Sequence, residues 1–132
     1  MKNYQKDYAR LRPQMCDRKS REKKAERIIK LLSYHLGSDK LKNLNILDIG
    51  ASTGIIDNYL ADYFKKATGT DIDQKAIEFA RKNSQKKNLE FKVEDAMNLS
   101  FKDNVFDIII CTHVYEHVPD PKKLFDHLTS LF

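Results

Sequence analysis

The sequence predicts an α/β fold in which helices cover both faces of a doubly wound parallel sheet. Strand-length apolar runs alternate with segments of helical periodicity at intervals of roughly twenty residues. The run over residues 105–112 is apolar almost throughout, which is typical of a parallel strand buried on both faces. A glycine, Gly50, ends the first apolar run. Such alternation indicates right-handed βαβ units.

Length and composition predict one globular domain. The chain has 132 residues, 41% of them apolar. We divide it into a basic arm over residues 1–18 and the domain over 19–132. The first thirty residues carry eleven Lys or Arg against four Asp or Glu. Such an excess of basic residues is compatible with binding to nucleic acid, anionic lipid or an acidic substrate. A solvent-exposed helix face has a similar number of charged residues, and we favour that interpretation.

Several classes of protein are disfavoured by the same composition. No apolar stretch has the length of a membrane span, and the charged N-terminus does not resemble a secretory signal. The two cysteines, Cys16 and Cys111, support neither a disulfide framework nor a zinc site. We therefore expect a cytoplasmic protein and no bound metal.

The first half of the chain predicts helix, strand, helix and strand in turn. Ser20 is a candidate N-cap for a helix that ends at Gly37. Strands are expected over 44–50 and 66–72. The helix expected between them, over 55–66, has a broad apolar face made of Ile55, Ile56, Tyr59, Leu60, Tyr63 and Phe64.

The second half repeats the pattern. Asp73 is the expected N-cap of a helix over 73–84, with Ile77, Phe79 and Ala80 turned inward. Strands are expected over 89–93 and 105–112. Asp120 and Pro121 are expected to open the last helix, as N-cap and first helical residue.

The turn after the first strand allows two unrelated interpretations. Residues 50–54 spell G-x-S-x-G, the turn that presents a nucleophilic serine in α/β-hydrolases. Ser52 would then act with Asp71 and His113, which follow in the right chain order. However, only one helix precedes this motif, and nothing upstream resembles an oxyanion loop. We therefore disfavour a hydrolase.

The second interpretation is a glycine turn that lets the backbone approach a nucleotide cofactor. The dinucleotide fingerprint G-x-G-x-x-G is not met, because Ser52 and Ile55 stand at its second and third glycine positions. NAD or FAD is therefore poorly supported. Asp71, at the end of the second strand, can still accept both ribose hydroxyls of an adenosine-containing ligand.

Four segments together resemble the class I S-adenosylmethionine-dependent methyltransferases of the small-molecule type. The first is the family's E/D-x-G-x-G-x-G motif, present here as DIGASTG over residues 48–54. The others are GTDID at 69–73, VEDAMNLSFKDNVFDII at 93–109 and THVYEHVPDPKKLF at 112–125. The resemblance implies a Rossmann-like sheet, of strand order 3-2-1-4 for the part present, and methyl transfer from S-adenosyl-L-methionine with S-adenosyl-L-homocysteine as product.

The resemblance also implies the roles of particular residues. The residues expected to contact the cofactor are Asp48, Gly50, Ala51, Ser52, Gly54, Asp71, Ile72, Asp95, Ala96 and Thr112. Asp48 would lie near the cofactor's ammonium group, Asp71 at the ribose and Ile72 against the adenine face. Asp95 would accept from the adenine amine, with Ala96 beside it through its backbone. For Asp71 and for Asp95, the alternative to cofactor contact is the structural role of a cap or turn residue.

Ser52 departs from the motif, because it occupies the middle glycine position. Either its Cβ narrows the approach to the cofactor, or its hydroxyl forms a hydrogen bond with the carboxylate. We leave open whether it weakens cofactor binding.

The loop after the fourth strand is expected to border the reacting methyl group, because ligands bind at the carboxyl ends of parallel strands where strand order reverses. Methyl transfer needs an aligned nucleophile and the exclusion of water, so no catalytic residue is obligatory. His113 is the candidate general base, with lining of the pocket wall as its alternative.

Members of the family build a seven-stranded sheet of order 3-2-1-4-5-7-6, and this sequence supplies the first four strands. The fourth strand would then be an apolar edge over 108–110. Three explanations differ in function: a truncated methyltransferase, a homodimer or partner chain joined at this edge, or a cofactor-binding module without independent activity. The expected acceptor is a small or glycan-like molecule, with nucleic acid less favoured.

Overall fold

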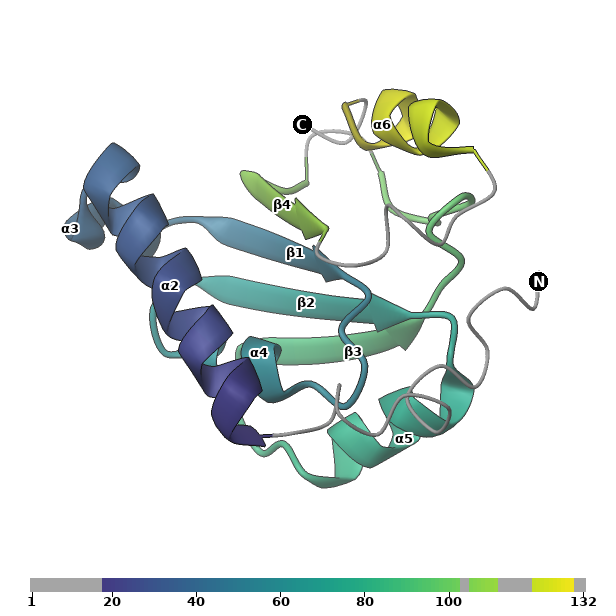
Figure 1. Cartoon of the computed structure of the whole chain (residues 1–132), viewed down its shortest axis with the longest axis horizontal. Helices are drawn as coiled ribbons and strands as arrows, with labels where there is room; N and C mark the ends of the chain where they lie inside the picture. Colours follow the sequence, from purple (N-terminus) through teal and green to yellow (C-terminus); the bar gives the residue numbers. More distant parts are fainter. Residues whose placement is uncertain (1–17, 103–104, 112–119, 130–132) are drawn as a thin grey trace.

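The computed structural model describes residues 18–102, 105–111 and 120–129. Within these ranges four parallel strands form one sheet in the order β3-β2-β1-β4, so the expected strand order is confirmed (Figure 1). The strands are β1 (Asn45–Ile49), β2 (Lys66–Asp71), β3 (Leu89–Val93) and β4 (Ile108–Cys111). The helices are α2 (Arg18–Leu36), α3 (Ser38–Leu41), α4 (Ile55–Ala61), α5 (Gln74–Lys82) and α6 (Pro121–Thr129).

Alternation of side chains along β1 divides the core between the two faces of the sheet. Ile46 packs with residues of α2 and α4, whereas Leu47 and Ile49 pack with Leu124 of α6. A third cluster joins α5 to the Phe91 ring of β3. Because successive strand residues point to opposite faces, Asp48 lies on the same face as Ile46, under α2 and α4. Helices therefore cover both faces, as expected.

Local capping explains where two of the helices begin. The Asp73 carboxylate accepts hydrogen bonds from the backbone N–H groups of Lys75 (3.1 Å) and Ala76 (3.3 Å), which confirms it as the N-cap of α5. Asp120 accepts from the Lys123 N–H at 3.1 Å at the start of α6. These bonds fix the direction in which each helix leaves its loop.

The structure corrects several predicted boundaries. Ser20 is not an N-cap, because α2 already includes Arg18, and the single-turn helix α3 was not predicted. The fourth strand is shorter than the predicted 105–112. It begins after Asp107, whose carboxylate accepts the Asn45 N–H at 2.8 Å in place of a backbone carbonyl. The first helix does end at Leu36, directly before Gly37, as expected.

Two aromatic side chains that were predicted to face the core are exposed. Phe79 is 55% exposed, because it lies roughly 200° around the helix axis from the buried Ile77. Tyr63 is 40% exposed, because α4 ends at Ala61 and the apolar face of the helix does not extend to it. No helix in the described ranges is long and apolar enough to cross a membrane.

Candidate cofactor site

The turn between β1 and α4 is fastened to the end of β2 by backbone hydrogen bonds. The N–H groups of Gly50 and Ala51 both donate to the Thr70 carbonyl at 2.8 Å. The Gly54 N–H donates to the Ala51 carbonyl at 3.0 Å, which closes the turn before α4 begins. These bonds hold the backbone of residues 50–54 close to the carboxyl ends of two neighbouring strands, where ligands bind in open α/β sheets.

Ser52 adopts a left-handed backbone conformation, with φ of 52°. A side chain in that region costs about 1–2 kcal/mol relative to glycine, so the turn carries some strain there. The Ser52 backbone N–H donates to Asp71 Oδ2 at 2.8 Å. Its hydroxyl is buried and has no hydrogen-bond partner among the described residues, so its bond with a carboxylate stays a prediction. No base among the described residues is hydrogen-bonded to it, and His113, the base of the hydrolase interpretation, lies outside them.

Asp71 joins the turn to the start of α5. Its Oδ2 accepts from Ser52, and its Oδ1 accepts from the Asp73 N–H at 2.9 Å. Burial raises the pKa of the Asp71 carboxyl above its ordinary value, while these two backbone donors oppose the rise. A carboxylate oxygen has two lone pairs, so each oxygen of Asp71 can still accept one more hydrogen bond.

Asp48 lies on β1 against a second acid, Asp57, which the sequence analysis did not identify. The two side chains are 2% and 1% exposed, and each carboxyl acts on the pKa of the other. Burial is the largest cause that raises the pKa of both carboxyls. The available sequence signal was an acid inside the apolar stripe of the helix, next to Ile56 and three residues before Leu60.

The residues predicted to meet the adenine lie at the carboxyl ends of β2 and β3. Ile72 and Ala96 are 5% and 6% exposed. The Asp95 carboxylate accepts the Met97 N–H at 2.9 Å, so the alternative of a turn residue is observed for it. The Glu94 N–H donates to the Asp71 carbonyl at 3.0 Å and holds these two strand ends side by side. Contact of Asp95 and Ala96 with adenine stays a prediction.

Thr112 and His113 lie outside the described residues, as does most of the basic arm predicted over 1–18. Their predicted roles, contact with the cofactor and general base catalysis, stay predictions.

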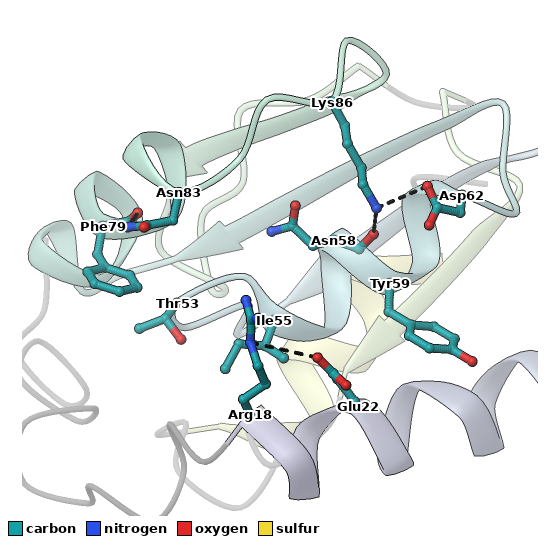
Figure 2. Close-up of a pocket in the computed structure, with 10 residues that line it drawn as sticks. All are labelled: Arg18, Glu22, Thr53, Ile55, Asn58, Tyr59, Asp62, Phe79, Asn83 and Lys86. Carbon is teal, nitrogen blue, oxygen red and sulfur yellow. Dashed lines mark hydrogen bonds and ion pairs between the residues drawn. The ribbon is translucent and has the colours of Figure 1, made fainter.

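A pocket of about 250 Å³ lies apart from most of these residues, between α2, α4 and α5 (Figure 2). Of its lining residues, Thr53 belongs to the turn and Ile55 is the first residue of α4. Its charged side chains are paired with each other, Arg18 with Glu22 at 3.7 Å and Lys86 with Asp62 at 3.0 Å. Its volume is below the roughly 300–1,000 Å³ typical of small-molecule sites. We therefore place the candidate site at the strand ends and not in this pocket.

Fold and site together define an α/β protein of the Rossmann-like class with a glycine-bearing turn after its first strand. Residues 47–131 match the family described as a methyltransferase domain. The chain therefore belongs to this family, the class I S-adenosylmethionine-dependent methyltransferases, whose cofactor is S-adenosylmethionine.

Individual relatives agree with this assignment. The chain is 30% identical over 93 residues to the ubiquinone biosynthesis O-methyltransferase of Coxiella burnetii, an alignment that covers 69% of this chain and 40% of the relative. The crystal structure of the YcgJ protein from Bacillus subtilis superposes with a TM-score of 0.71 at 26% identity, over 82% of this chain and 45% of that one.

The magnesium protoporphyrin IX methyltransferase ChlM of Synechocystis, solved with bound S-adenosylmethionine, gives a TM-score of 0.69 at 23% identity. That alignment covers 83% of this chain and 53% of ChlM, and it supports the fold alone. The chain thus spans about 40% of the length of the curated relatives it matches.

Proposed function

We propose that this chain binds S-adenosylmethionine across the β1–α4 turn and the end of β2, as part of a methyltransferase that acts on a small molecule. The observation that carries the proposal is the Asp71 carboxylate, which is fixed by two backbone N–H groups and keeps one acceptor position on each oxygen. That arrangement suits the two adjacent hydroxyls of a ribose.

The residues of the turn fit the cofactor. The buried Ser52 hydroxyl forms no hydrogen bond within the described part of the chain, so it can donate to a ligand atom. Gly50 and Gly54 have φ of 87° and 81°, a conformation that glycine adopts readily. Because glycine has no side chain, a ligand can approach the backbone at both ends of the turn. Ile72 supplies an apolar contact at the end of β2.

When bound, the cofactor supplies a methyl group on a positively charged sulfur. The chain's own residues then have three tasks: to hold the ribose at Asp71, to hold the amino-acid end on the turn, and to exclude water. In the proposed mechanism His113 accepts the proton that a hydroxyl acceptor loses as its oxygen is methylated. The acceptor class follows the named O-methyltransferases of ubiquinone biosynthesis, which act in the synthesis of a small molecule.

Calorimetric titration with S-adenosylhomocysteine tests cofactor binding. We expect Asp71→Ala to weaken binding by about tenfold or more, because a hydrogen bond to a charged group contributes about 1.5–3 kcal/mol. Asp107→Ala is the matched control, since its carboxylate also accepts a backbone N–H at 2.8 Å but lies at the opposite end of the sheet. A folded wild-type chain that binds nothing, or an equal loss in both variants, would overturn the proposal.

The alternative is a cofactor-binding module without methyl transfer of its own. Incubation of the chain with S-adenosylmethionine and a panel of phenolic and other hydroxyl acceptors distinguishes the two. Formation of S-adenosylhomocysteine that depends on an acceptor supports the enzyme. Binding without turnover on any acceptor supports the module.

The pairing of this chain with another chain and its location in the cell remain predictions. β4 pairs with β1 along one edge, and no described strand pairs with its other edge. We propose that a second copy or another chain pairs there, which analytical ultracentrifugation would detect as a species heavier than the 15.4 kDa monomer. The cytoplasmic location stays a prediction.

A further inference from the structure

Two buried acids bracket the turn on which the cofactor is proposed to lie. Asp48 precedes the turn on β1, and Asp57 follows it on α4. Both side chains are almost completely buried. Among the residues that the structure describes, no N–H or O–H donor forms a hydrogen bond with Asp48 Oδ1 or with either carboxyl oxygen of Asp57. Buried acceptors of this kind are rare in folded proteins and call for an explanation.

A shared proton provides that explanation. Two carboxyl groups can be hydrogen-bonded to each other only when one of them carries a proton, because an ionised carboxylate is an acceptor alone. Burial, followed by the charge of Asp48, raises the pKa of Asp57 well above its ordinary value. The pair therefore satisfies itself with one proton and one negative charge.

The charged groups around the pair support this count. From α2, Arg21 and Lys24 act on Asp48, and Arg21 also acts on Asp57. From β2, Asp71 adds a third acid. Two cations then face three acids, and one proton on the Asp48–Asp57 pair removes the excess negative charge. Arg21 is only 8% exposed, so little water screens this cluster on the α2 side.

A cation placed on the turn changes the balance. A positive charge within a few ångströms favours the ionised form of an acid, so the pair would then lose its proton. In S-adenosylhomocysteine, whose sulfur carries no charge, the amino group is the cation available to the Asp48 side of the turn once both ribose hydroxyls lie at Asp71. This step rests on the function proposed above.

We propose that Asp57 is a positioning residue of the cofactor site that shares one proton with Asp48 in the free chain, and that the pair releases this proton to solvent when the amino group of the cofactor occupies the turn. On ligand binding the charge of the Asp48–Asp57 pair changes from −1 to −2, and the released proton is taken up by the buffer. The ammonium group of the ligand compensates the additional negative charge. Asp57 acts through Asp48 and need not touch the ligand.

The test is a calorimetric titration with S-adenosylhomocysteine in buffers of different ionisation enthalpy. We expect release of up to one proton per ligand bound, and an affinity that rises with pH by up to about tenfold per unit while the pair titrates. The control ligand is 5′-methylthioadenosine, which lacks the amino-acid end, and its binding should release none. Asp57→Asn should also release none, since its amide can donate to Asp48 at any pH.

A second measurement follows the free chain. Carboxyl ¹³C chemical shifts should show an aspartate that keeps its proton above about pH 6, where the pKa of Asp48 lies, and this signal should be absent in Asp57→Asn. Should the Asn variant not fold, Asp57→Ser supplies a smaller donor at the same position.

The outcomes separate the two proposals. If no aspartate retains its proton, or if S-adenosylhomocysteine binds with the same enthalpy in every buffer, the shared proton or its release is overturned while cofactor binding stands. If the folded chain binds no S-adenosylhomocysteine at any pH, the proposed function fails and the release with it, whereas the carboxyl titration still decides whether the proton is shared.

Discussion

Gly54→Ala is expected to destabilise the chain by two separable effects. Gly54 is the N-cap of α4 and has φ of 81°, a conformation that costs an alanine about 1–2 kcal/mol. An added Cβ would also lie 2.5 Å from Phe91 Cζ and 3.1 Å from the Ala80 Cβ, both closer than side chains normally approach. Forcing a methyl group into such a space costs about 1–3 kcal/mol. The combined loss is about 2–5 kcal/mol.

Gly37→Ala isolates the backbone contribution. Gly37 has φ of 88°, but an added Cβ there would have no atom within 4 Å. Gly37→Ala should therefore lower the free energy of unfolding by about 1–2 kcal/mol, so the difference between the two variants measures the clash with Phe91. Urea unfolding followed by far-UV circular dichroism gives both free energies. Equal losses in the two variants would refute the packing explanation.

Three further outcomes follow from the described contacts. Burial and the charge of Asp48 raise the folded-state pKa of Asp57 well above its ordinary value, so the stability that protonated Asp57 contributes is complete below about pH 4 and is lost as the pH rises through that folded-state pKa. Because asparagine does not titrate, the stability of Asp57→Asn relative to wild type should increase as the pH rises above about 4, by up to about 1.4 kcal/mol per unit, and a decrease in melting experiments would contradict the sign. Asp73→Ala removes the N-cap of α5 and should lower the free energy of unfolding, measured in urea, by about 0.5–2 kcal/mol. An unchanged free energy would mean that water replaces the cap. Asn88→Ala removes the side-chain amide that donates to the backbone carbonyls of Ala61 (2.7 Å) and Phe64 (3.1 Å) at the end of α4. We expect the free energy of unfolding to fall by about 1–3 kcal/mol, and an unchanged urea midpoint would contradict this.

Local chemistry made parts of the fold predictable. β3 occupies the predicted residues 89–93, since its ends are set by the neighbouring turn and by alternation along the strand. Asp73 and Asp120 were identified as caps because a cap acts on residues two or three positions away. Strand order 3-2-1-4 came from the family resemblance and not from periodicity.

The features that escaped prediction depend on contacts between distant segments. Asp57 lies inside the apolar stripe of its helix, but the sequence does not show which groups it meets, and Arg21 is one of many charges on the first helix. Both are buried because α2 packs across α4 over the end of β1, an arrangement that local sequence does not encode. The exposure of Phe79 was predictable in principle from its angle to Ile77 on the helix wheel.

The Phe91 ring occupies the space left by two missing side chains. A Cβ on Gly54 would meet this ring at 2.5 Å, and a Cβ on Gly69 in the middle of β2 would meet it at 2.9 Å, with the Ala51 methyl equally close. One aromatic ring on β3 thus fills the space above Gly69 in the sheet and beside Gly54 in the turn. A larger residue at position 69 therefore requires a smaller one at position 91, whereas at position 54 the positive φ disfavours a side chain even when the ring is removed. The ring links the packing of β3 to the shape of the turn that is proposed to hold the cofactor, without itself having to touch the cofactor.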